Sequence, residues 1–465
     1  MILCATFALA SLPPAALAED FENNIEKTFT VSSGGKLKVD VDLGSVTVNT
    51  DADGKAEIHV YRKYKKGSKS DADKWFAEHP VTIAQQGNEV SVTQKNKKSF
   101  VWTRGLELEV RYVVSIPRKF NVDLGTAGGS ISVADLDGVA SCRTSSGQIK
   151  LAKITGKVST SNAGGSIQLE SGGSDVFART SSGSVQIQKA AGKIEASNAG
   201  GSIKIDECES SVTASTSSGS ITIDSAKGDV TAKNAGGSVK IGAISGNVSA
   251  ESSSGSISIA SVDGKKVDVR NAGGNIDIGT AAGEVTARTS SGSIRIKRAA
   301  GAVSATNAGG HVAIDESDGD IVAQTSSGSI TIGSAKGKLD LKDSGGRIEI
   351  KQVSGAVNAD TSSGDIVVNF AGTPKEDCQI HTSGGGIKVG VVHSAALNVD
   401  AKVAGGSVKV EPPLTVAVQG ENKHGELHGK INGGGANLNL RSSSGNIQLR
   451  EFAPEKLAAE DENRK

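Results

Sequence analysis

The chain has 465 residues, with 51 basic and 51 acidic side chains and a formal net charge of +0. This balance excludes a strong overall attraction to nucleic acid, an anionic membrane or an acidic polymer. The 59 glycines and the aromatic content of only 3% do not describe ordinary globular cores, so internal repeats are the first pattern to seek.

The N-terminal segment is apolar from Ile2 to Ala18 and ends in small residues before Glu19. It is too short to span a bilayer and has the pattern of a secretory signal peptide. We therefore predict a signal peptide over residues 1–18 and an extracytoplasmic protein, located in the periplasm, on the outer surface or in the medium. No later apolar run long enough to cross a bilayer follows, so we expect no transmembrane segment after signal removal.

Residues 19–121 alternate between apolar and polar side chains as a small β module that caps the N-terminal end of the chain. Strands are predicted around residues 36–48, 57–64, 81–83, 89–93 and 106–114. The module holds both tryptophans, Trp75 and Trp102, and all three tyrosines. The rest of the chain has to form its core from aliphatic residues and alanine.

One strand of this module is followed by the strongest local concentration of positive charge. Its basic residues, interleaved with tyrosines, are Arg62, Lys63, Lys65, Lys66 and Lys69. They could bind a polyanion of the cell envelope. The same pattern is also typical of a solvated hairpin edge whose lysines prevent edge-to-edge association.

Residues 122–372 form a regular repeat, in which glycine, any residue, and isoleucine or valine recur at a constant interval. The apolar anchors are Ile131, Ile149, Ile167, Val185, Ile203, Ile221, Val239, Ile257, Ile276, Ile294, Val312, Ile330, Ile348 and Ile366. One step is longer by a single residue, and this extra residue falls near Lys265-Lys266. The residue two after each anchor is again apolar, and a second alternating pair such as Val212 and Ala214 follows, so each coil contains two strands. The fold class is therefore all-β, a parallel β-helix or β-solenoid with 18-residue, two-strand coils.

Two further positions repeat in every coil and indicate its corners. A glycine precedes each anchor by two residues, and we expect it to supply a positive φ at the turn. This set of turn glycines includes Gly147, Gly183, Gly219, Gly255, Gly292, Gly328 and Gly364. Five residues before the anchors, threonine alternates with asparagine in phase with the apolar residues, which predicts an inward polar ladder. Its members include Thr180, Asn198, Thr216, Asn234, Asn271, Thr289, Asn307 and Thr325.

The period loosens after the regular coils. Residues 373–450 are predicted to form irregular solenoid coils and a C-terminal cap, interrupted by Pro412-Pro413. A cap is required because a coil satisfies its backbone only by pairing with its neighbours. Residues 451–465 are charged and are predicted to be a disordered tail.

The segment Ile116-Pro117-Arg118-Lys119, then Val122-Asp123-Leu124-Gly125-Thr126 and the glycine-punctuated strands, resembles the adhesin-like families of exported β-strand repeats. These families have no known function. The resemblance covers nearly the whole chain after residue 18. It implies a bacterial cell-envelope protein with an N-terminal β region and a solenoid, and it carries no catalytic residue.

Motifs for metal or redox chemistry are weak. Calcium-binding β-rolls place aspartates at fixed turn positions, whereas these turns carry serine and alanine. The acidic segment Asp315–Asp320 is the one corner that could hold a cation, and it also has the composition of a solvated turn. Cys142 and Cys208 fall on inward positions, and with Cys378 they predict buried free thiols rather than disulfides. We expect no catalytic residue, no metal and no cofactor.

The sequence therefore predicts an exported, non-catalytic scaffold, adhesin-like, that acts through repetitive polar faces. The expected partner is an unidentified envelope or surface polymer or protein, or a second copy of the chain, and not nucleic acid. Two alternatives stay open. One is a polysaccharide lyase or hydrolase with a site in the irregular coils between Lys375 and Leu440, and the other is a periplasmic sensory or regulatory binding partner.

Overall fold

The computed structural model describes residues 19–95, 107–419 and 424–454. The expected signal peptide, Trp102 and residues 455–465 of the charged tail lie outside the described residues. Contacts within the chain define two compact units, one up to Ile154 and one from Thr155.

The first unit is built almost wholly of strands, in agreement with the predicted fold class. Its elements are β1 (Glu19–Thr30), β2 (Lys36–Val41), β3 (Ser45–Asn49), β4 (Lys55–Gly67), α1 (Lys69–Glu78), β5 (Thr82–Gln86), β6 (Glu89–Gln94), β7 (Glu107–Ser115), β8 (Asn121–Thr126), β9 (Ile131–Val133), β10 (Ala140–Thr144) and β11 (Ile149–Ile154). The long strands β1, β4 and β7 pair antiparallel. The strands from β8 onward pair in parallel at the spacing of the repeat, so that Ala140 of β10 lies beside Val122 of β8.

The coil formed by β2 and β3 lies between two coils that follow it in the chain. β2 pairs in parallel with β6 on one side and with β8 on the other. β3 pairs in the same way with β7 and β9. An early segment is therefore enclosed by later ones, and both of its edges are hydrogen-bonded.

The helix α1 was not expected from the alternation pattern. It begins after Ser68, whose side chain accepts a hydrogen bond from the backbone N–H of Asp71, and it buries Ala72 and Trp75. The Ser68 hydroxyl in turn donates to the Asp71 carboxylate at 2.7 Å. A capping serine followed three residues later by an acidic residue is a known signal for the start of a helix, so the sequence did contain the information. Among the described residues no helix is long and apolar enough to cross a bilayer.

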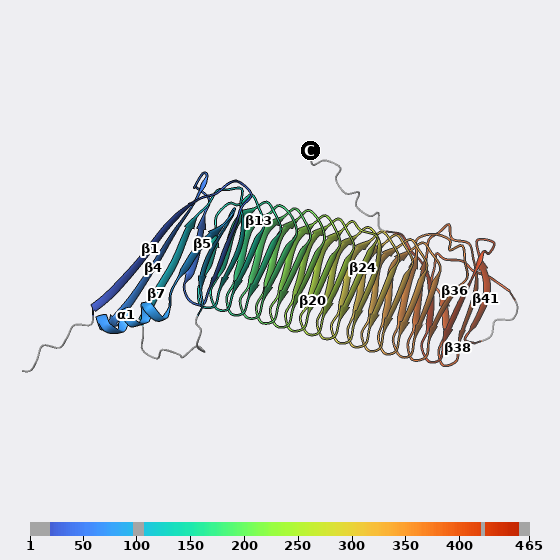
Figure 1. The fold of residues 1–465 in the computed structure, drawn as a ribbon. Coiled ribbons are helices and arrows are strands. Elements are labelled where there is room, and N and C mark those ends of the chain that lie inside the picture. The colour runs from blue at the N-terminus through green and yellow to red at the C-terminus, as the bar shows by residue number, and fades with distance from the viewer. Residues whose placement is uncertain (1–18, 96–106, 420–423, 455–465) are drawn as a thin grey trace, which may run out of the picture. The chain divides into compact units, whose positions relative to one another are not determined.

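The second unit is a stack of two-strand coils (Figure 1). Alternate strands belong to two sheets, which we call sheet A and sheet B. In the regular coils, sheet A contains β13 (Ile167–Gly172), β15 (Val185–Ala190), β17 (Ile203–Cys208), β19 (Ile221–Ala226), β21 (Val239–Ile244), β23 (Ile257–Val262), β25 (Ile276–Ala281), β27 (Ile294–Ala299), β29 (Val312–Ser317), β31 (Ile330–Ala335), β33 (Ile348–Val353) and β35 (Ile366–Phe370). Sheet B contains β12 (Val158–Asn162), β14 (Val176–Thr180), β16 (Ile194–Asn198), β18 (Val212–Thr216), β20 (Val230–Asn234), β22 (Val248–Ser252), β24 (Lys266–Asn271), β26 (Glu284–Thr289), β28 (Val303–Asn307), β30 (Ile321–Thr325), β32 (Leu339–Asp343) and β34 (Val357–Thr361).

Parallel pairing keeps each residue beside its equivalent in the next coil. Ile203 pairs with Ile221 in sheet A, and Val212 pairs with Val230 in sheet B. This offset grows by one between β22 and β24, where Val248 pairs with Val267. The sheet A pair before it, Ile244 with Val262, still has the regular offset. The extra residue therefore lies in the turn after Val262, in the region that the sequence indicated.

The core between the sheets is made of small and medium aliphatic side chains. Ile221, Ile223 and Ala232 are fully buried, and Val230 is nearly so. Isoleucine and valine from sheet A face valine and alanine from sheet B, so large residues on one side meet smaller ones on the other. The burial of this continuous apolar column stabilises each coil only when neighbouring coils cover its two edges.

At the C-terminal end of the second unit, one coil again lies between two coils that are both on the same side of it in chain order. It contains β36 (Cys378–Thr382), β37 (Ile387–Val391), β38 (Leu397–Val403), β39 (Val408–Val410), β40 (Ala417–Val418), β41 (Glu426–Ile431), β42 (Ala436–Ser442) and β43 (Ile447–Glu451). β42 pairs in parallel with both β36 and β38, and β43 pairs in parallel with both β37 and β39. The last coil in the chain is thus inserted between two earlier coils, and β41 and β40 continue sheet B in antiparallel fashion.

Candidate functional site

The turn glycines have a different role from the one expected. None of the seven has a φ in the left-handed region. Instead, a Cβ added at Gly219 would overlap the carbonyl oxygen of Gly201 in the preceding coil, and each of the other six has the same relation to its neighbour. The expectation of positive φ is therefore wrong. Glycine is needed because the backbones of stacked coils approach closely at this corner.

Beside these glycines, the alternating threonines and asparagines point inward. The eight side chains named above are between 2% and 6% exposed. Each donates a hydrogen bond to a glycine carbonyl of the preceding coil, at distances from 2.6 Å for Asn198 to 3.1 Å for Thr289. The asparagines also accept bonds from the turn that follows, as Asn234 does from the N–H groups of Gly236 and Gly237. This buried row fixes the corner that supports the surface described next.

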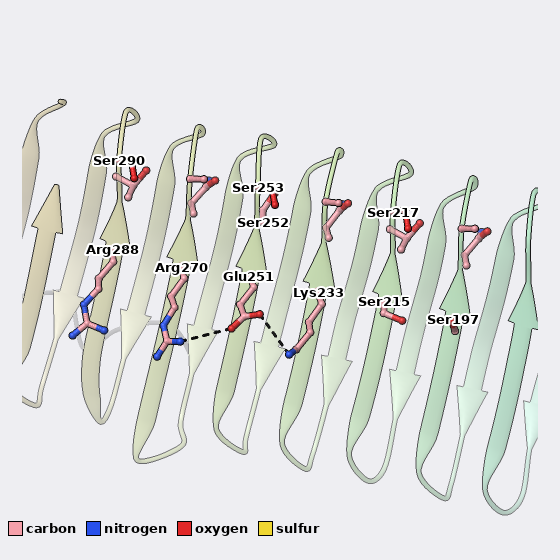
Figure 2. A pocket seen from close by; sticks show the side chains of 18 of the residues that line it. Ser197, Ser215, Ser217, Lys233, Glu251, Ser252, Ser253, Arg270, Arg288 and Ser290 are labelled. Atoms are coloured by element: carbon pink, nitrogen blue, oxygen red, sulfur yellow. Dashed lines mark ion pairs between the residues drawn. The ribbon is translucent and has the colours of Figure 1, made fainter. Parts of the chain in front are cut away.

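A shallow groove of about 1080 Å³ follows that corner along the outer face of sheet B. Two rows of side chains line this groove, and both recur from coil to coil (Figure 2). One row holds the small exposed residues that come directly after the polar ladder, alternately serine and alanine, such as Ser217 and Ala235. The other row holds the residue before each ladder position, from Arg179 in β14 to Thr306 in β28. These eight strands span roughly 34 Å at about 4.8 Å per strand.

The charges along the groove are predominantly positive. The charged side chains that line it are Arg179, Lys233, Glu251, Arg270 and Arg288, four positive and one negative, which gives a net charge of +3. Glu251 lies 3.5 Å from Lys233 and 3.9 Å from Arg270. Arg270 also contacts Asp268 at 3.2 Å. These paired side chains stay 41–60% exposed, apart from Asp268 at 23%, so the groove is open to solvent.

Sheet A carries a different charge pattern, in which several cations lie beside an anion of the next coil. Lys189 contacts Glu207 at 2.9 Å, and Arg298 contacts Glu316 at 2.7 Å. The acidic segment 315–320 belongs to this pattern. Asp318 lies 2.7 Å from Lys336, whose ammonium group holds the pKa of Asp318 below its usual value. Because basic side chains neutralise these carboxylates, the segment is poorly suited to hold a cation.

The basic residues of the first unit do not form a free cationic surface. Arg62 is only 5% exposed and donates to Asn23 and to the carbonyl of His79. Lys63 lies 3.0 Å from Asp20, and hydrogen bonding to that carboxylate raises the pKa of Lys63. Lys65 and Lys66 form ion pairs with Glu109 and Glu107. Lys69 is the first residue of α1 and is exposed.

The irregular C-terminal coils contain two small groups of titratable side chains that include histidine. His381 lies 2.8 Å from Asp360, and Asp400 lies 2.6 Å from Arg441 and 3.1 Å from His428. These side chains are 37–58% exposed on an open strand face, which provides no exclusion of water. Within the described part of the chain, no three His, Cys, Asp or Glu side chains are grouped so as to hold a metal ion.

The three described cysteines are buried and free. Burial raises the pKa of the Cys142 thiol to about 12 and also raises the pKa values of Cys208 and Cys378. Thiols in this state are poor nucleophiles at neutral pH.

Comparison with known proteins supports the fold. The family model described as Toastrack DUF4097 matches residues 36–229, 207–336 and 320–450. No curated protein matches the chain. Among solved structures, a candidate adhesin from Bacteroides fragilis is 17% identical, with 54% of this chain and 97% of that chain covered and a TM-score of 0.27.

Two further solved structures show lower scores. A candidate cell adhesion protein from Clostridium sporogenes is 10% identical, with 92% of this chain and 100% of that chain covered and a TM-score of 0.16. A candidate lipid-binding protein from Parabacteroides distasonis is 14% identical, with coverage of 72% and 96% and a TM-score of 0.14. TM-scores this low support no argument about this chain, so its family membership rests on the match to the family model.

Proposed function

Because the chain belongs to the Toastrack DUF4097 family, whose function is unknown, we propose that it is an exported, non-catalytic scaffold of the cell envelope. It binds a surface polymer or protein, or another copy of itself, weakly at many equivalent positions. The observation that carries this proposal is the groove of sheet B, where the same two rows of side chains recur over eight successive strands.

Repetition of a weak contact favours binding to a partner that is itself repetitive. Once one contact has formed, the next contacts form at a high effective concentration, so the overall affinity exceeds that of any single position. The parallel register supplies the required geometry, because equivalent residues of successive coils lie side by side, as Ser197 and Ser215 do. A rigid array of this kind needs no enclosed pocket.

The enzyme alternative has weaker support. Glycoside cleavage requires carboxylates placed on both sides of a scissile bond, or an equivalent acid and base set. The exposed pairs of His381 with Asp360 and of His428 with Asp400 provide acid and base groups. They lie on an open face, so we retain this alternative only as an outcome of the experiment.

The test uses a shortened array. Deletion of residues 201–236 removes two coils and joins Gly200 to Gly237, which preserves the alternation of threonine and asparagine corners. The purified protein and this variant are compared for binding to intact bacterial cells and isolated envelope polymers, and for self-association by sedimentation.

We expect the shortened protein to melt cooperatively and to bind or self-associate more weakly, since it offers fewer equivalent positions. Equal binding by both proteins would indicate a single local site and contradict the proposal. Release of reducing ends or unsaturated sugars from a polymer would instead support the enzyme alternative.

A further inference from the structure

We infer that the groove of sheet B is a binding site for one linear acidic polysaccharide chain, held along the stacking direction of the coils. This inference rests on the proposed function and specifies the ligand of the same surface. It follows from three properties of the groove, namely its charge, its lack of aromatic side chains and its small hydroxyl-bearing row.

The charge of the groove indicates an anionic ligand. Four cations and one anion line it, whereas on sheet A cations such as Lys189 and Arg298 lie beside an anion of the next coil. Arg179 and Arg288, near its two ends, have no ion-pair partner among the described residues, while Lys233 and Arg270 share Glu251. Three of the four cations are arginines, whose guanidinium groups bind carboxylates and sulfates through two parallel hydrogen bonds.

The absence of aromatic side chains argues against two classes of polymer as ligands of the groove. None of the described residues that line the groove is aromatic. Single-stranded nucleic acids bind largely by stacking bases on aromatic rings, so this surface lacks the main contact that they need. Neutral polysaccharides also use aromatic platforms, because the apolar faces of the sugar rings pack against them. A ligand recognised here must rely on charge and hydrogen bonding.

The remaining row is suited to a hydroxyl-rich chain. Serines recur at every second coil, at Ser181, Ser217, Ser253, Ser290 and Ser326, with alanines between them. Their hydroxyl groups therefore repeat at about 10 Å, twice the strand spacing. A flat groove with this regular set of donors and acceptors can accept an extended polymer whose own repeat includes a hydroxyl and an acidic group.

The inference is tested with two triple variants of equal net charge. Arg179→Ser/Arg270→Ser/Arg288→Ser removes the arginines of the groove and introduces the residue that already occupies this row at Ser197 and Ser215. The control, Lys204→Ser/Lys240→Ser/Arg295→Ser, removes three outward cations from sheet A. Binding of polygalacturonate, neutral dextran and a single-stranded DNA oligonucleotide is measured by calorimetry at two salt concentrations.

We expect wild-type protein to bind polygalacturonate, more weakly at high salt, and to bind dextran not at all. The groove variant should lose about tenfold in affinity, the combined effect of three exposed charge contacts, and the control less than about twofold. Glu251→Gln should strengthen binding, because it removes the one anion of the groove, frees Lys233 and leaves Arg270 with Asp268 as its only ion-pair partner among the described residues. A gain of affinity cannot result from damage to the fold.

Equal losses in both triple variants, binding of dextran, or tighter binding of the oligonucleotide than of polygalacturonate would each overturn the inference. If the groove variant still adheres to cells while the deletion of residues 201–236 weakens adhesion, the ligand assignment fails and the proposed function stands.

Discussion

At the scale of single residues, the corner glycines show that one sequence pattern can have two different structural causes. Strict glycine at one position is compatible with a left-handed φ or with a close backbone approach. The structure shows the second: a Cβ at Gly346 would overlap the carbonyl oxygen of Gly328. Its neighbour Gly345, in the same turn, would place a Cβ 3.6 Å from the nearest atom.

These two glycines allow a matched test. Gly346→Ala should destabilise the protein by about 1–3 kcal/mol, because the obstructing atom belongs to the backbone and can move only by separating two coils. Gly345→Ala should change stability by no more than about 0.5 kcal/mol, since it introduces an ordinary contact. Chemical denaturation of both variants checks this expectation, and similar losses in the two would contradict it.

The groove was missed at the residue scale although its signal is present in the sequence. The pattern that predicts the coils consists of apolar anchors, turn glycines and inward polar residues, and none of these positions faces outward on sheet B. The row that lines the groove comes directly before each threonine or asparagine, as Arg179, Lys233, Arg270 and Arg288 do. In the linear sequence these residues are one or more whole coils apart, and only parallel register brings them into one line.

At the scale of the elements, the polar ladder determines how one strand pair joins the next. Asn234 donates to the carbonyl of Gly219 at 2.8 Å and accepts from the N–H groups of Gly236 and Gly237, each at 3.1 Å. Threonine on the same row makes fewer bonds. Thr325 donates to Gly310 at 2.9 Å and accepts from the N–H group of Gly328 at 3.3 Å.

The loss of stability caused by a substitution at Asn234 should increase with the number of hydrogen bonds that the substitution removes. Asn234→Ala leaves a buried carbonyl and turn N–H groups without partners and should cost about 2–3 kcal/mol. Asn234→Thr should cost less, about 1 kcal/mol, because the hydroxyl can reproduce the threonine type of corner. Thermal or urea unfolding measures the difference, and equal losses for alanine and threonine would show that the ladder bonds contribute little.

The elements also differ in how well the sequence predicts them. The regular coils follow from the constant period because each coil repeats the same local chemistry, down to the turn that absorbs one extra residue. The helix α1 was missed because residues 65–80, between two predicted strands, were interpreted from their positive charge and not from the capping residues Ser68 and Asp71. The order of the terminal strands cannot be read from the pattern, since β42 has the alternation of any other strand and its two partners are set by tertiary packing.

At the scale of the whole molecule, the stability of each coil is expected to depend on its immediate neighbours. Each coil pairs only with those beside it, so damage should remain local. A chain ending after Gly435 lacks β42 and β43, which connect the coil of β38 and β39 to that of β36 and β37.

In this truncated chain, amides of β38 and β39 should exchange rapidly with solvent while those of β20–β30 remain protected, as measured by hydrogen–deuterium exchange. A chain ending after Pro454 is the control, because it retains every described strand. Protection of β38 and β39 in the shorter protein would show that they can pair without the inserted coil.

The inserted terminal strands also impose an order on events during biosynthesis. Ribosomes release a chain from its N-terminal end, yet the gap beside β38 can be filled only by residues from Ala436 onward. Until residues 436–451 have been made, β38 therefore has only β41 as a partner and β39 lacks its partner β43. Residues 436–451 then close this gap like a latch, so a chain that stops before Ala436 would expose unpaired strand edges that are prone to association.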